Sequence, residues 1–113
     1  MTATRRDGLS LVLARLAPAI PRFEHEAVLD HACASKGLAK ASAEAAVWLS
    51  LVAVARHLLT DYDRLLADGQ DQDSARWFVV DDINRVLASW GCPKRVSGNP
   101  DLPDGAAHYP KIT

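Results

Sequence analysis

Apolar residues recur every three or four positions along most of this chain, which is the period of an amphipathic α-helix. The first run predicts a helix over about residues 8–17, ended by Pro18, with an apolar stripe of Leu9, Val12, Leu13 and Leu16. A second helix is expected over residues 22–35, because Pro21 suits its first turn and Gly37 follows its end.

The third run is the clearest and predicts a long central helix over about residues 43–67. Ser42 suits the N-cap, and Asp68 and Gly69 suit the end. One stripe is predicted to be buried along the whole length: Val47, Trp48, Leu51, Val52, Ala55, Leu58, Leu59, Tyr62, Leu65 and Leu66. Leu49, Ala53 and Val54 make the first half apolar on the opposite side too, so this helix should begin at the centre of the domain.

A fourth helix is predicted over about residues 72–90, with acidic residues at its start and Gly91 at its stop. Its buried stripe should be Ala75, Val79, Ile83, Val86, Leu87 and Trp90. The short turn after residue 67 predicts that this helix and the central one form an antiparallel hairpin. Residues 93–113 carry four prolines and two glycines without a period, which predicts an irregular Pro-rich C-terminal tail.

These elements predict one all-α domain over residues 1–113, with four main helices, a core over about 8–92 and the tail over 93–113. Arg5 and Arg6 before an apolar run imitate a targeting signal. Arg15 interrupts that run too early for a signal peptide, so we expect a helix of the mature protein. The only cysteines, Cys33 and Cys92, have no metal-ligand spacing and indicate reduced thiols in the cytoplasm.

The net charge limits the classes of partner that this chain is expected to bind. A formal net charge of −1 gives no bulk attraction to nucleic acid or to an anionic membrane surface. A helix-turn-helix reading of the last two helices would place Asp71, Asp73, Asp81 and Asp82 on the recognition helix, where they would repel phosphate. No apolar stretch is long enough to span a membrane. We therefore expect neither a nucleic-acid partner nor a membrane partner.

The candidate catalytic residues are His57 and Asp61. They are spaced i, i+4 on one predicted helix face, together with Ser50 and Arg64. Such a pair can orient an imidazole for proton transfer or contribute to a metal site. The same spacing also occurs on any solvated helix face, and that is the simpler interpretation.

A metal site would need ligands from a second helix. Asp30 or His31 could join His57 and Asp61 if the second and third helices cross. No spacing in the chain specifies a metal, so the expectation is no metal and no cofactor, with His31, His57 and Asp61 as the candidates should one bind.

Two further features of the fourth helix carry predictions. Trp77 and Phe78 lie off its buried stripe and need a cover, either the C-terminal tail or a second subunit, and a subunit contact is favoured. In an antiparallel hairpin, Asp63 would lie level with Arg76. This predicts a structural ion pair that clamps the two helices.

Residues 46–90 carry an ordered set of motifs: R-H-L-L-T-D-Y-D-R-L-L at 56–66, Gly69, A-R-W-F-V at 75–79 and V-L-A-S-W at 86–90. This set resembles a bacterial family known as domain of unknown function 2293, with the pattern R-H-x-x-T-x-Y-D-x-L-L, a glycine turn, A-R-x-x-V and V-L-x-x-W. The resemblance implies no activity. It marks a small group as the recognisable part: His57, Thr60, Asp61, Tyr62, Asp63 and Arg76.

The sequence therefore favours a small cytoplasmic binding or protein-interaction module of unknown partner, without catalytic activity and forming a homo-oligomer. The alternative is a metal- or histidine-dependent enzyme centred on His57 and Asp61.

Overall fold

A computed structural model of the chain describes residues 4–97, and in this part it contains only helices and their connections. The elements are α1 (Arg5–Leu16), α2 (Arg22–Ala34), the 3₁₀ helix η1 (Lys36–Leu38), α3 (Ala43–Leu59), α4 (Tyr62–Ala67) and α5 (Gln72–Ser89). The prediction of an all-α fold is confirmed for these residues.

Side-chain caps fix where three of the helices begin. Thr4 and Asp7 form a reciprocal capping box at the start of α1. The hydroxyl of Ser42 accepts a hydrogen bond from the Ala45 N–H at 3.1 Å, and the carboxylate of Asp71 accepts one from the Ser74 N–H at 2.8 Å. The predicted N-cap at Ser42 is therefore confirmed.

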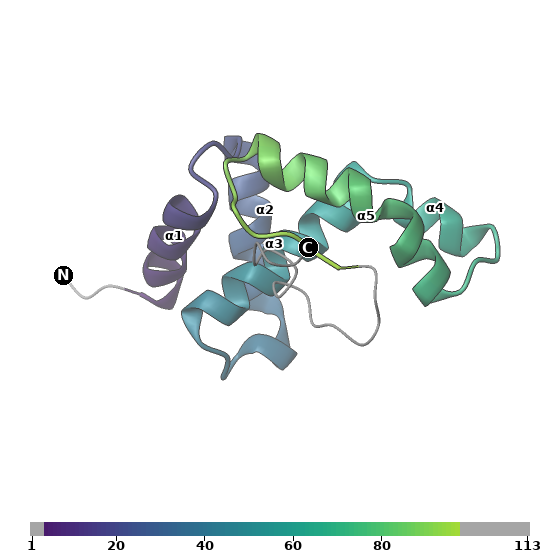
Figure 1. Cartoon of the computed structure of the whole chain (residues 1–113). Coiled ribbons are helices and arrows are strands. Elements are labelled where there is room, and N and C mark those ends of the chain that lie inside the picture. Colours follow the sequence, from purple (N-terminus) through teal and green to yellow (C-terminus); the bar gives the residue numbers. More distant parts are fainter. Residues whose placement is uncertain (1–3, 98–113) are drawn as a thin grey trace.

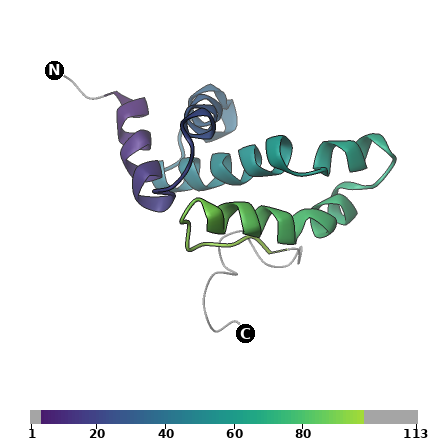
Figure 2. The same ribbon diagram turned by 90° about the horizontal axis from the view of Figure 1, so that it is seen from above.

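Helix α3 lies at the centre of the molecule and contacts every other α-helix. Helices α1 and α2 lie against its N-terminal half, while α5 runs back along α4 and α3 on another side (Figures 1 and 2). The core therefore follows α3. Its fully buried larger side chains come from α1, α2, α3 and α5: Leu9, Leu13, Val28, Val47, Leu51, Val79, Ile83 and Leu87.

The predicted continuous helix over 43–67 is interrupted. Helix α3 ends at Leu59, and α4 begins at Tyr62, because Thr60 adopts an extended backbone conformation with φ −133° and ψ 174°. The predicted stripe is correspondingly cut short, since Leu58 and Leu59 are exposed. They lie in the last turn of α3, beyond the part of that helix that α1 and α2 cover (Figure 2).

The stripe predicted for the last helix is confirmed. Ala75, Val79, Ile83, Leu87 and Trp90 are buried, and Val86 packs against them. The helix ends one residue early, at Ser89, with Trp90 as its C-cap.

The segment after α5 turns back along that helix. The Cys92 N–H donates to the Leu87 carbonyl at 2.9 Å. Val96 then makes two backbone hydrogen bonds to the side-chain amide of Asn84, at 2.8 and 3.2 Å. The first residues of the predicted tail are thus fixed to α5, and residues 98–113 of the tail lie outside the described residues.

Candidate functional site

The R-H-L-L-T-D-Y-D stretch forms a corner between α3 and α4. The Thr60 hydroxyl donates to the Arg56 carbonyl at 2.5 Å and accepts from the Tyr62 N–H at 3.2 Å. One side chain thereby satisfies a carbonyl at the end of one helix and an N–H at the start of the next, where regular helical bonds are missing. The sequence contains a signal for this corner, because Asp61 and Asp63 are residue types favoured at a helix N-terminus.

The aromatic ring of Tyr62 is the buried centre of this corner. The His57 ring meets it edge-on with centroids 5.3 Å apart, and the Arg56 guanidinium carbon lies 5.4 Å from its centroid. His57 Nδ1 lies 2.7 Å from Asp63 Oδ1, and since an ionised carboxylate only accepts, the imidazole donates. The side chains of His57 and Asp63 are about half exposed (48% and 59%), so this pair adds little stability in water.

The structure pairs these residues differently from the prediction. Asp61 accepts a hydrogen bond from Arg64 at 2.9 Å and is not the partner of His57. Asp63 bonds to His57, and no ion pair between Asp63 and Arg76 occurs within residues 4–97. The break at Thr60 puts Asp63 in the first turn of α4, next to the last turn of α3, which carries His57.

The candidate metal ligands are not brought together. His31 Nδ1 lies 2.8 Å from the hydroxyl of Ser50, which is fully buried although the sequence placed it on the solvated face with His57. In the described part of the chain, no group of three His, Cys, Asp or Glu side chains could hold a metal ion.

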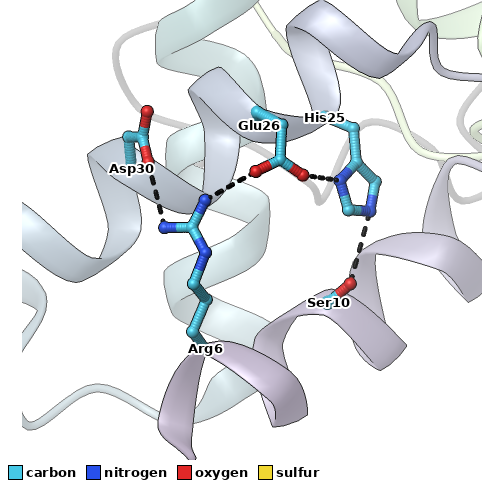
Figure 3. Close-up of polar contacts among 5 residues, drawn as sticks. All are labelled: Arg6, Ser10, His25, Glu26 and Asp30. Carbon is cyan, nitrogen blue, oxygen red and sulfur yellow. Dashed lines mark hydrogen bonds and ion pairs between the residues drawn. The ribbon is translucent and has the colours of Figure 1, made fainter.

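A second polar cluster, not anticipated from the sequence, joins α1 to α2 (Figure 3). The Arg6 guanidinium donates to Glu26 and to Asp30, both at 2.9 Å, and these bonds raise the pKa of Arg6. The pKa of Glu26 is lowered, first by its hydrogen bond from Arg6 and then by the one from His25. The signal for this cluster was the acid spacing i, i+4 on the second helix, which suits one guanidinium.

His25 also connects Glu26 to Ser10, with His25 Nδ1 3.3 Å from Glu26 and His25 Nε2 3.4 Å from Ser10 (Figure 3). This order of groups resembles a Ser–His–acid triad, which also requires N–H donors for a developing oxyanion. Ser10 lies inside α1, where the surrounding N–H groups are used by the helix. The arrangement therefore suits a contact between helices and not acyl transfer.

Two open hollows of about 460 Å³ each lie on the described surface, and neither is lined by residues of the corner. One is lined by Val12, Arg15, Leu16, Glu44 and Lys94, and the other by Arg22, Phe23, Glu26, Ala27 and Asp30. His57 and Asp63 thus do not line either of these open hollows.

The third feature is the side of α5 that points away from the core, which we call the outer face. Trp77 is 66% exposed and Phe78 is 62% exposed on this face. This face also exposes Asp81, Arg85, Ala88 and Ser89. Two large aromatic side chains on one helix form an apolar surface that the described chain leaves uncovered.

Comparisons with known proteins add a family but no activity. Over residues 4–97 the structure has no helix with the length and apolar character needed to cross a membrane. No curated protein and no solved structure matches the chain. A family model described as uncharacterized conserved protein (DUF2293) matches residues 12–91, a wider range than the motifs alone had indicated. The match includes α2, α3, the corner, α4 and α5, and the chain therefore belongs to the DUF2293 family.

Proposed function

We propose that this protein is a small cytoplasmic protein-interaction module that self-associates through the outer face of α5 and has no catalytic activity of its own. The observation that carries the proposal is the exposure of Trp77 and Phe78 side by side on that face. Aromatic residues are enriched in protein interfaces because they bury a large area at a small cost in side-chain entropy.

The two polar clusters support the interpretation that the polar residues outside the outer face have structural roles. The corner around Thr60 and the Arg6 cluster each join two helices through their own side chains. The hydrogen bonds of the corner engage His57, Thr60, Asp61 and Asp63 within the domain, so these recognisable residues have a structural role that needs no reaction. Cys33 and Cys92 are both free thiols, which suits the reducing cytoplasm.

Replacing Trp77 and Phe78 together with Ser tests the proposal. We expect the wild-type chain to sediment at twice the 12.2 kDa of one chain, and the double variant to sediment as a monomer. Phe23→Ser is the matched control, because Phe23 is 72% exposed on α2, away from the outer face, and its loss should leave the dimer intact.

Two results would contradict the proposal. A wild-type chain that remains a monomer over a concentration series has no self-association to explain. A double variant that remains a dimer places the interface elsewhere. Circular dichroism of each variant verifies that its helices are intact.

A further inference from the structure

The outer face of α5 is asymmetric along its length. Its first half carries the large side chains of Trp77 and Phe78, and its last turn carries the small side chains of Ala88 and Ser89. Between them lie the acid Asp81 and the base Arg85, a helical turn apart. Such a surface, large at one end and small at the other, is complementary to itself when one copy is reversed.

We propose that two copies of the chain pair their α5 helices antiparallel about a two-fold axis level with Ile83, so that Asp81 of each copy binds Arg85 of the other. This inference rests on the proposed function and names the partner and the register of the same face. The partner is a second copy of this chain, selected by charge and by side-chain size.

Side-chain size supports this register. With the axis level with Ile83, Trp77 and Phe78 lie opposite the last turn of the second copy, Trp77 within one residue of level with Ala88 and Phe78 within one residue of level with Ser89. At 100° per residue, Trp77 and Ala88 lie on one edge of the contact stripe, and Phe78 and Ser89 on the other. A two-fold axis perpendicular to the plane of the two helices places each edge of the stripe against the same edge of the other copy. Each large ring therefore meets a small residue, which lets the two helices approach closely.

Charge selects the same register. Within residues 4–97, Asp81 forms no ion pair, and Arg85 forms one, with the neighbouring Asp82 at 2.6 Å. The Arg85 side chain is 73% exposed. In a parallel pair, Asp81 would meet Asp81 and Arg85 would meet Arg85. An antiparallel pair centred on Asp81 would also place two like charges together. Like charges in a contact oppose association, so the register level with Ile83 is favoured.

Charge reversal tests the register. Asp81→Arg alone gives two Arg–Arg contacts, and Arg85→Asp alone gives two Asp–Asp contacts. Each single variant should therefore raise the dissociation constant of the dimer by about tenfold or more. An equimolar mixture of the two single variants should recover a dimer, because each contact in the mixed dimer then joins an Arg to an Asp. The double variant Asp81→Arg/Arg85→Asp should dimerise by itself for the same reason.

The outcomes separate the two proposals. If the Trp77→Ser/Phe78→Ser variant remains a dimer, the proposed function is overturned and this inference falls with it. If that variant dissociates but the mixture of charge-reversed variants stays monomeric, the interface stands and the antiparallel register is overturned. Thermal unfolding followed by circular dichroism verifies that each charge variant is folded, as expected for substitutions at exposed positions.

Discussion

The Thr60 hydroxyl makes two hydrogen bonds that a methyl group in its place could not make. It donates to the Arg56 carbonyl and accepts from the Tyr62 N–H at the corner between α3 and α4. We expect Thr60→Val, which keeps the shape of the side chain, to lower the free energy of unfolding by about 1–2 kcal/mol. Urea denaturation followed by circular dichroism measures the change.

Thr60→Ser is the matched control for this prediction, because it keeps the hydroxyl and removes a methyl group. It should lose clearly less stability than the valine variant. Equal losses in the two variants would show that the hydroxyl does not hold the corner.

The same corner shows why individual pairings were hard to predict from the sequence. His57 and Asp63 are six positions apart, a spacing that does not bring side chains together on a continuous helix. The break at Thr60 places them 2.7 Å apart and leaves Asp61 to Arg64. The hydrogen bonds of Thr60 thus changed the partners of both His57 and Asp61. The hydrophobic periodicity of a sequence contains no information about such local bonds.

At the scale of the helices, periodicity was the better guide. The stripe of α5 was predicted residue by residue, because it packs along its whole length. The buried stripe of α3 was predicted correctly from Val47 to Ala55. The prediction was wrong at Leu58 and Leu59, which lie beyond the part of α3 that α1 and α2 cover. A sequence shows which side of a helix is apolar. It does not show how far the neighbouring helices extend along that side.

Gly91 gives a prediction about how α5 ends. It follows the C-cap with φ 78°, a conformation that favours glycine, and a Cβ there would lie 3.1 Å from Pro18 Cγ. Gly91→Ala should therefore lower the free energy of unfolding by about 1–2 kcal/mol from backbone strain alone. Chemical denaturation measures this loss.

Gly8→Ala is the opposite case and serves as the control. Gly8 lies inside α1, and a Cβ there would meet nothing within 4 Å. This substitution should raise stability by about 0.5–1 kcal/mol, because alanine loses less backbone entropy than glycine in a helix. If Gly91→Ala leaves the free energy of unfolding unchanged or raises it, the role assigned to Gly91 is wrong.

At the scale of the whole molecule, the connection between α1 and α2 meets the C-terminal end of α5. The Ala19 N–H, in the connection between α1 and α2, donates to the Trp90 carbonyl at 2.9 Å. Cys92 is buried next to this contact, and its thiol approaches the Lys94 carbonyl at 3.8 Å. This junction ties α1 and α2 to the end of α5.

The two cysteines can report whether that junction opens. Cys33 is exposed on α2, while burial raises the pKa of the Cys92 thiol and lowers its thiolate fraction. At neutral pH, a thiol reagent should modify Cys33 readily and Cys92 more slowly, by on the order of a hundredfold if opening of the junction costs about 3 kcal/mol.

Gly91→Ala should speed the labelling of Cys92 and leave the rate at Cys33 unchanged, because it weakens only the junction. Mass spectrometry of the labelled chain follows both sites in one experiment. Equal rates at the two cysteines in the wild-type protein would mean that the junction is open in solution, and that α1 and α2 are not held there.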